Sequence, residues 1–228
     1  MAGGLDLQPV WLTVRLAGLT TIVLLMAGTP LAWWLAHTRS RFKVPVEAVT
    51  ALPLVLPPTV LGFYLLMLLG ANGALGGAWR TLTGQPLAFS FAGLVVASCV
   101  YSLPFVVQPL QAAFERLDRH AVEAAWTLGA SRARTFATVV LPQVRRGLLT
   151  AVVLGFAHTL GEFGVVLMVG GNIPGRTQVV SIAIFEQVEA MEYRTAAVLS
   201  TGLLAVSFLV LMLVYGVNRR WRAGAQGL

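Results

Sequence analysis

Five apolar stretches, each long enough to cross a lipid bilayer, constrain the fold of this chain more than any other feature of its sequence. An α-helix needs about 20 residues to cross about 30 Å of hydrocarbon. The stretches cover residues 10–36, 46–70, 88–114, 147–169 and 196–217. Because 57% of the 228 residues are hydrophobic and only 11% are charged, a water-soluble domain could not cover its apolar surface. The sequence therefore predicts an all-α membrane protein with five transmembrane helices.

The positions of the basic residues indicate which ends of these helices face the cytoplasm, since lysine and arginine concentrate on that side of a membrane. Twelve of the 16 basic residues follow the first, third or fifth stretch: Arg39, Arg41, Lys43, Arg116, Arg119, Arg132, Arg134, Arg145, Arg146, Arg219, Arg220 and Arg222. The others, Arg15, Arg80, Arg176 and Arg194, fall toward the opposite side. We therefore expect the N-terminus outside and the C-terminus in the cytoplasm. The net charge of +7 thus marks a membrane side and does not indicate nucleic-acid binding.

Residues 179–193 have the periodicity of a helix but are too acidic to cross the membrane. Apolar side chains recur at helical spacing, with glutamates beside them: Ile182, Phe185, Val188 and Met191, and Glu186, Glu189 and Glu192. Amphipathic helices of this kind lie along the membrane interface or insert partly. We expect such a helix between the fourth and fifth crossings.

The loop between the third and fourth stretches contains local signals for two short helices. Asp118 is suited to cap a first helix over residues 121–128, and Gly129 is suited to the left-handed position after its end. Ser131 is suited to cap a second helix, which we expect Pro142 to interrupt. The sequence thus predicts a helix, a glycine turn and another helix at the cytoplasmic edge of the membrane.

The first of these helices has an unusually small surface. Its alanines, which let another backbone approach closely, are Ala121, Ala124 and Ala125, with Ala130 just beyond. Glu123 supplies one charged anchor, and such a surface suits docking into a groove of another protein. A plain connector between two membrane helices explains the same residues, so composition alone leaves both interpretations open.

A longer pattern in this loop resembles the EAA loop of ABC importer permeases. Glu123-Ala124-Ala125 is followed after three residues by Gly129, and after nine more by Val139-x-Leu141-Pro142, with valine in place of the family's isoleucine. The resemblance implies the type I ABC importer permease fold, with residues 115–146 forming a cytoplasmic coupling loop within one permease domain, residues 1–228. It implies contact with a separate ATPase through Glu123, Ala124, Ala125, Gly129, Ala130, Leu141 and Pro142.

Three further segments are similar to the permease of the molybdate ABC importer: LPLVLPPTVLG at 52–62, LGEFG at 160–164 and GNIPG at 171–175. Sulfate permeases share parts of the last two. The resemblance implies that the chain carries molybdate across the cytoplasmic membrane by alternating access, with sulfate and tungstate as alternative cargoes. A proton-coupled secondary transporter that uses His158 and Glu162 is a rival from another class.

The resemblance also implies which partners the chain has and that it catalyses no reaction itself. It implies a homodimer in the bacterial inner membrane, surrounded by lipid, with two cytoplasmic ATPase subunits that hold ATP and magnesium. An extracytoplasmic oxyanion-binding protein would supply selectivity, because Arg15 and His158 are the only candidate cations within the apolar stretches. The chain is then a transport subunit and not an enzyme, with no cofactor or metal of its own. The run GGNIPGRT at 170–177 imitates a phosphate loop, but arginine replaces the required lysine.

Two groups of residues are predicted on the translocation pathway or its gate. Proline removes a backbone donor, and inside a bilayer the freed groups are tolerated only against protein or a water-filled cavity. We therefore expect the broken second stretch to line the pathway, with a kink needed only for packing as the alternative. His158 and Glu162 lie four residues apart, so we expect them to share one helix face, as a gate or as a structural hydrogen bond. The predicted residues are Pro53, Pro57, Pro58, Gly62, His158, Gly161, Glu162 and Gly164.

Overall fold

The computed structural model describes residues 7–225, and its regular elements in this range are all helical. They are α1 (Gln8–His37), α2 (Lys43–Ala51), η1 (Leu52–Leu54), α3 (Pro58–Leu69), α4 (Ala74–Thr83), α5 (Phe91–Glu115), α6 (Arg119–Thr127), α7 (Arg132–Thr135), η2 (Phe136–Val140), α8 (Leu141–Leu160), α9 (Gly164–Gly170), α10 (Val180–Glu189) and α11 (Tyr193–Ala225). Residues 1–6 and 226–228 are outside this range. Within it, the side chains of Arg219, Arg220 and Arg222 are not among those described.

Four helical stretches are individually long and apolar enough to cross a membrane. They are Gln8–His37, Phe91–Glu115, Arg132–Leu160 and Tyr193–Met212. A fifth crossing exists only if Lys43–Leu54 and Pro58–Leu69, bent by 112°, count as one broken span. The five predicted crossings therefore correspond to four long helices and one bent pair. The proline-rich stretch is the place of the bend.

The main core lies between α1, α5 and α8. Leu24, Leu110 and Val144, one from each helix, are buried in the same cluster. Gly155 of α8 lies so close to α5 that an added Cβ atom would be 2.7 Å from Cγ2 of Val106. Small residues at a membrane-helix interface allow this kind of close approach. The three helices thus form a packed unit to which the remaining elements are attached.

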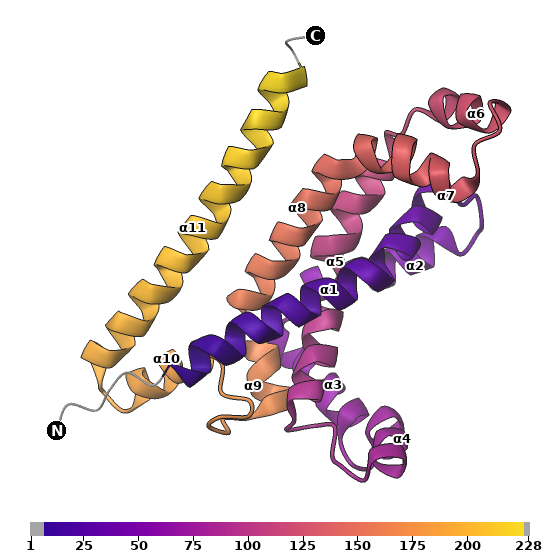
Figure 1. The fold of residues 1–228 in the computed structure, drawn as a ribbon. Coiled ribbons are helices and arrows are strands. Elements are labelled where there is room, and N and C mark those ends of the chain that lie inside the picture. The colour runs from indigo at the N-terminus through magenta and orange to yellow at the C-terminus, as the bar shows by residue number, and fades with distance from the viewer. Residues whose placement is uncertain (1–6, 226–228) are drawn as a thin grey trace.

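The three core helices run side by side through the middle of the molecule (Figure 1). The helices α6 and α7 lie at one end, and α4, α9 and α10 lie at the other. Helix α11 contacts α10 and α8 and runs along the bundle toward the end that carries α6. The first turn of α1 and the last turn of α11 therefore lie at opposite ends of the molecule.

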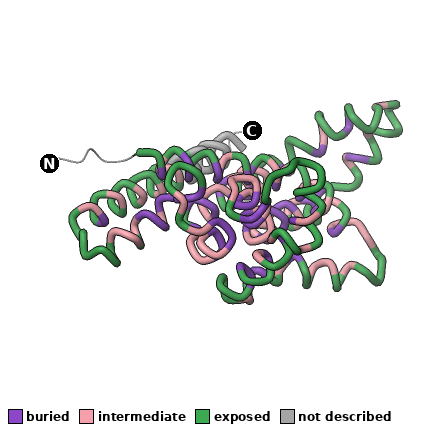
Figure 2. The backbone as a smooth tube through the Cα atoms, turned by 90° about the horizontal axis from the view of Figure 1, so that it is seen from below, coloured by how far each residue is buried: buried purple, intermediate pink, exposed green. Residues whose placement is uncertain are grey.

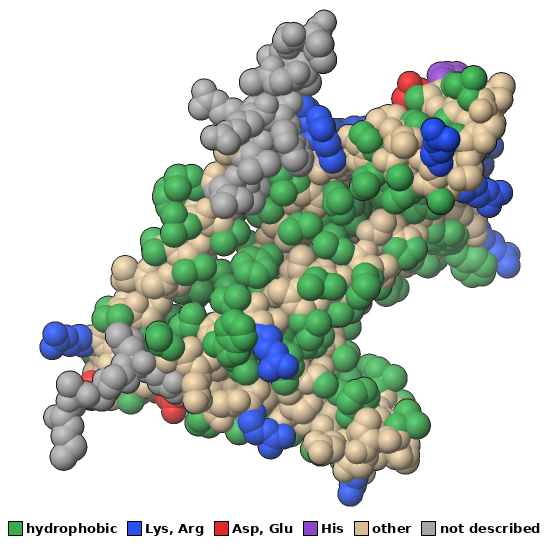
Figure 3. Space-filling view, viewed as in Figure 1, with side chains coloured by type: hydrophobic (Ala, Val, Ile, Leu, Met, Phe, Trp, Pro, Cys, Tyr) green, Lys and Arg blue, Asp and Glu red, His purple; other side chains and the backbone are tan. Residues whose placement is uncertain are grey.

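The surface is apolar along the bundle and charged at its ends, as expected for a protein in a bilayer. Buried residues are most frequent in the centre of the molecule, and the segments that project from it are mainly exposed (Figure 2). Hydrophobic side chains cover the middle of one face, while Lys and Arg gather around the α6 end, with smaller groups at the other end (Figure 3). Only 6% of the most apolar window of α11 is buried, so this helix depends on lipid or another protein for its apolar contacts.

The fourth predicted crossing, residues 147–169, is not one continuous helix as the apolar run suggested. Helix α8 ends at Leu160, and α9 starts at Gly164. Gly161 caps α8 with φ −94° and ψ 4°, outside the helical conformation. The apolar character continues across the break, so hydropathy alone did not reveal it. The LGEFG segment is the linker between two half-helices.

The prediction that Pro142 interrupts the second loop helix is also wrong. The chain continues from α7 through a π-helical turn, Phe136–Val140, directly into α8. Pro142 lies in the first turn of α8. Proline needs no partner for a backbone N–H, and the wider π turn before it leaves room for its ring. The proline therefore marks a change of helical winding, not a helix end.

Candidate functional site

Residues 115–146 are held in place by the capping residues that the sequence predicted. The Asp118 carboxylate accepts a hydrogen bond from the His120 N–H at 2.9 Å and caps α6. Gly129, just past the end of α6, has a φ of 79°. The Ser131 hydroxyl accepts from the Arg134 N–H at 3.3 Å and caps α7. The predicted helix, glycine turn and helix are confirmed, with α6 spanning Arg119–Thr127 in place of residues 121–128.

A substitution at Gly129 tests backbone strain alone, without any effect on packing. No atom lies within 4 Å of a Cβ added at this position, so a substitution meets only the cost of a positive φ. Alanine in the left-handed conformation costs about 1–2 kcal/mol, whereas asparagine visits it more readily. We expect Gly129→Ala to speed proteolysis of the loop and lower ATP-driven uptake several-fold, with Gly129→Asn close to the original protein. Equal behaviour of all three proteins would contradict a requirement for this turn.

Helix α6 presents two large apolar side chains that the sequence interpretation overlooked. Glu123 and Ala124 are exposed, as the docking interpretation requires. Trp126 and Leu128 are 53% and 88% exposed, and both lie beside the EAA residues. Val122 points the other way and is 8% exposed within the main core. Large exposed apolar side chains flanking a small-residue pattern were readable in the sequence and indicate a protein contact.

The inner side of α6 is connected to two membrane helices through a hollow of about 410 Å³. Its lining includes Trp33 of α1, Val122 and Trp126 of α6, and Phe136 and Val140 of the π turn. Beside the hollow, Val122 packs in the same apolar cluster as Trp33 of α1 and Val140 of the π turn, so α6 is in contact with both. Leu141 and Pro142, the last residues of the EAA pattern, follow this π turn and belong to α8 itself.

The two broken helices meet at residues that were predicted on the pathway. The break before α3 lies at Pro57, which is extended (φ −54°, ψ 137°) and is followed by Pro58 as the first residue of α3. A Cβ atom added to Gly164, the first residue of α9, would be 2.8 Å from Cβ of Pro58. One added to Gly62 would be 2.8 Å from Cβ of Met168. The glycines thus let α3 and α9 pack directly on each other.

A cavity of about 610 Å³ lies beside this contact. It is lined by Pro58, Thr59, Tyr101, Ala157, His158, Gly161, Glu162, Phe163 and Gly164. The structure therefore brings together five of the eight residues predicted on the pathway or gate. Pro53, Pro57 and Gly62 are not in the lining, and Pro53 is instead buried within η1. Thr59 and Tyr101 line the cavity without having been predicted, because only the fold brings α3 and α5 beside α8.

The prediction that His158 and Glu162 share a helix face is wrong, because α8 ends between them. Nδ1 of His158 is 2.9 Å from the Ser102 hydroxyl, and its ring stacks on Phe105 at 3.9 Å between centroids. In the described part of the chain, His158 and Glu162 form no ion pair. His158 thus makes the structural hydrogen bond, to α5. Ser102 was not predicted, since a contact between distant segments leaves no local pattern.

Glu162 occupies the break between α8 and α9 with only 4% of its surface exposed. Its backbone carbonyl accepts from the Ser181 hydroxyl at 2.6 Å. The buried Ser98 hydroxyl is the polar neighbour of the Glu162 carboxyl group, but neither of the two makes a hydrogen bond of good geometry among the described residues. Leaving a buried carboxyl group unpaired is costly, so a site that retains one is a functional candidate. The carboxyl group lies at the wall of the cavity.

A helical membrane bundle with broken helices around a cavity and a capped, exposed loop at one end defines the membrane subunit of a transporter. Residues 28–223 match the binding-protein-dependent transport system inner membrane component family, and this chain belongs to that family. It is therefore an inner-membrane transport subunit and not an enzyme.

Two relatives and one solved structure describe its place within the family. The chain is 58% identical over 219 residues to the molybdenum transport system permease protein ModB of Azotobacter vinelandii, covering 96% of both chains. It is 36% identical over 211 residues to the sulfate transport system permease protein CysT of Synechocystis sp., covering 92% of this chain and 72% of that one. A chain of the MetNI methionine ABC transporter has a TM-score of 0.70 at 17% identity, with 95% of both chains covered. The predicted ABC importer permease fold is confirmed.

Proposed function

We propose that this chain is the permease of an ABC importer that moves molybdate into the cell. The observation that carries the proposal is the 58% identity to the molybdenum permease of Azotobacter vinelandii, which extends over 96% of both chains. The identity to the sulfate permease is lower, and the sulfate permease is longer than this chain. Sulfate is therefore the second candidate, and tungstate, which resembles molybdate in charge and shape, is the third.

The proposed orientation puts α6 and α7 in the cytoplasm and the start of α1 outside. It is supported by the basic side chains gathered around the α6 end, since positive residues favour the cytoplasmic side (Figure 3). The last turn of α11 reaches the same end as α6. The α4 end would then face the extracytoplasmic binding protein.

The proposed mechanism uses two copies of the chain, residues 1–228 of each forming one permease domain. The exposed face of α6, with Glu123, Ala124 and Ala125, binds a cleft in a separate ATPase that holds ATP and magnesium. When two ATPase subunits close on ATP, they draw the two α6 helices together, and the apolar cluster around Val122 transmits this movement to α1 and α8. The cavity between the broken helices then opens alternately to each side of the membrane.

Within this mechanism, the residues at the breaks form the pathway and its gate. The half-helices α3 and α9 pack closely against each other at Gly62 and Gly164, so we propose that they move together. Glu162 is proposed as a gate residue and not as a ligand, because a carboxylate repels a dianion. The proton-relay alternative has less support, because His158 is hydrogen-bonded to Ser102 and forms no ion pair with Glu162 among the described residues, although both line the cavity.

The experiment that tests the proposal is uptake into proteoliposomes that contain the permease, its ATPase and its binding protein. We expect ATP-dependent accumulation of labelled molybdate, competed by tungstate and much less by sulfate. Accumulation in liposomes that lack the ATPase would contradict an ABC importer. Stronger competition by sulfate than by tungstate would replace molybdate by sulfate as the cargo.

A further inference from the structure

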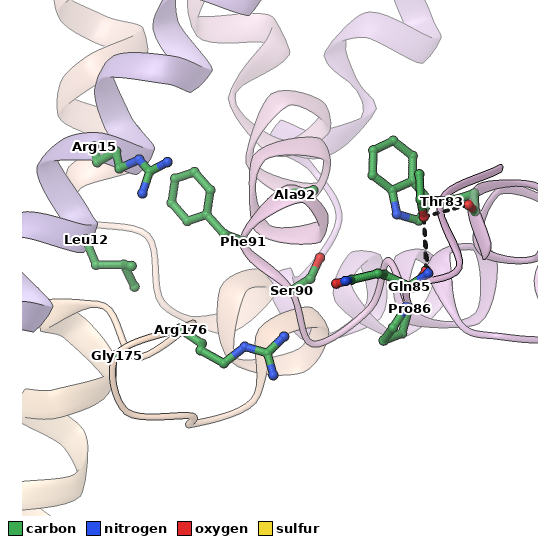
Figure 4. Close-up of a pocket in the computed structure, with 11 residues that line it drawn as sticks. Leu12, Arg15, Thr83, Gln85, Pro86, Ser90, Phe91, Ala92, Gly175 and Arg176 are labelled. Atoms are coloured by element: carbon green, nitrogen blue, oxygen red, sulfur yellow. Dashed lines mark hydrogen bonds between the residues drawn. The ribbon is translucent and has the colours of Figure 1, made fainter.

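A second pocket, of about 520 Å³, lies at the end of the molecule opposite α6. It is bounded by the first turns of α1 and α5, the end of α4 and the loop after α9. Figure 4 shows Arg15 beside the Phe91 ring at one side of the pocket and Arg176 at another, with Ser90 between Arg176 and Gln85. The transport mechanism proposed above does not use this pocket.

Among the described residues, the lining of this pocket contains no acidic side chain. Its charged residues in that part of the chain are Arg15 and Arg176, which give it a charge of +2, and both are exposed. Among the described residues, no carboxylate lies within salt-bridge distance of either guanidinium group. Two arginines that line one pocket and form no ion pair among the described residues attract an anion, and a divalent anion matches their combined charge.

Both arginines are held in place by local structure. The guanidinium carbon of Arg15 lies 4.7 Å from the ring centroid of Phe91, a cation–π contact that leaves its N–H groups free to donate. Arg176 lies in a loop closed by the Thr177 hydroxyl, which donates to the Gly170 carbonyl at 2.7 Å and accepts from the Ile173 N–H at 3.2 Å. The GNIPG segment at 171–175 belongs to this loop, and Gly171 and Gly175 take positive φ values of 64° and 72°.

We propose that this pocket is an extracytoplasmic binding site for a tetrahedral oxyanion, held by Arg15 and Arg176. Planar guanidinium groups donate paired hydrogen bonds to such oxygens. Because both arginines are exposed, binding is weak and decreases with salt, as suits an ion that is passed on to the pathway. The chemistry is shared by a free oxyanion and by the phosphate of a lipid headgroup. The identification of the free anion as the transported cargo rests on the proposed function; the site itself does not.

The test places one reactive thiol in the pocket of the assembled permease–ATPase complex. Cys99 is the only cysteine, so Gln85→Cys in a Cys99→Ser background gives a single exposed thiol. Its reaction rate is measured with a negatively charged sulfonate and a positively charged trimethylammonium methanethiosulfonate. We expect the negative reagent to react at least about fivefold faster, because two nearby positive charges act on reagents of opposite sign. Millimolar molybdate or sulfate should slow this reaction.

Two variants decide whether the arginines cause the difference in reaction rates and the protection by molybdate. Arg15→Gln combined with Arg176→Gln should equalise the two rates and remove the protection by molybdate. Arg80→Gln is the matched control, because Arg80 is exposed on α4 but is not in the pocket lining. Equal rates for the two reagents in the parent protein, or protection that persists in the double variant, would overturn the site. Protection by the binding protein but not by free anions would overturn it as well.

Lipid composition distinguishes the two sources of the anion. In detergent and in phosphatidylcholine nanodiscs, protection by molybdate assigns the site to a free oxyanion. If phosphatidylglycerol nanodiscs alone give the protection and molybdate adds none, the occupant is a lipid headgroup. Uptake by the unmodified complex is measured in parallel. Import without protection overturns the site alone, and protection without import overturns the proposed function alone.

Discussion

Replacing Glu123 by arginine is expected to abolish ATP-driven uptake. Glu123 is exposed on α6, and its neighbours Ala124, Trp126 and Leu128 are exposed with it, so the substitution changes charge at a surface without disturbing the core. If α6 binds the ATPase through Glu123, replacing the negative charge by a positive one removes a charge pair with the ATPase. It also places two positive charges against each other. Breaking a buried charged contact costs about 2–5 kcal/mol, which corresponds to a loss of about 30-fold or more in affinity.

Copurification of the ATPase with the permease and uptake into proteoliposomes measure the two consequences. The matched control is Glu189→Arg, because Glu189 is an exposed glutamate on α10, at the opposite end of the molecule. This control should retain the ATPase and most uptake. A Glu123→Arg protein that still binds and responds to the ATPase would contradict the assignment of α6 as the coupling helix. Loss of uptake with full ATPase binding would assign Glu123 to signal transmission alone.

Replacing Gly164 by valine is expected to separate the two broken helices and to lower both stability and uptake. An added Cβ would lie 2.8 Å from Cβ of Pro58, whose ring has no alternative rotamer that relieves the contact. Overpacking of this kind costs about 1–3 kcal/mol. Since α3 and α9 border the cavity, we also expect uptake per folded molecule to fall, because the two half-helices can no longer pack in their original positions.

The control for this variant is Gly18→Val in α1. A Cβ added at Gly18 would have no atom within 4 Å, and Gly18 does not line the cavity. Thermal unfolding in detergent and uptake normalised to folded protein should separate the two variants. Equal melting temperatures and equal uptake would mean that the packing of α9 on α3 is not required.

The sequence predicted the elements whose signals are local. Asp118, Gly129 and Ser131 were assigned correctly, because caps and left-handed turns depend on neighbouring residues only. Pro57 and Pro58 located the break before α3, but no local rule gives its angle of 112°. The break after Leu160 was missed, because Gly161 and Gly164 are tolerated inside many membrane helices. The contacts that explain them, with Pro58 and α3, lie far away in the sequence.

The interpretation of the candidate site was limited in the same way. The spacing of His158 and Glu162 suggested a shared face only as long as one helix was assumed to contain both. The neighbours that each residue has in the structure, Ser102 and Ser98 on α5, depend on how α8 packs. Arg15 was noted as a candidate cation within the first apolar stretch, and Arg176 as an outer charge in a run that imitates a phosphate loop. That both line one pocket depends on the packing of α1, α5 and the loop after α9.

The small buried fraction of α11 means that the chain contributes little to holding its own last helix. Most of the apolar surface of α11 must be covered by lipid or by another protein. The boundary lipid, or a neighbouring copy, is in this sense a missing part of the tertiary structure. Delipidation during purification should therefore release α11 before it disturbs the bundle of α1, α5 and α8.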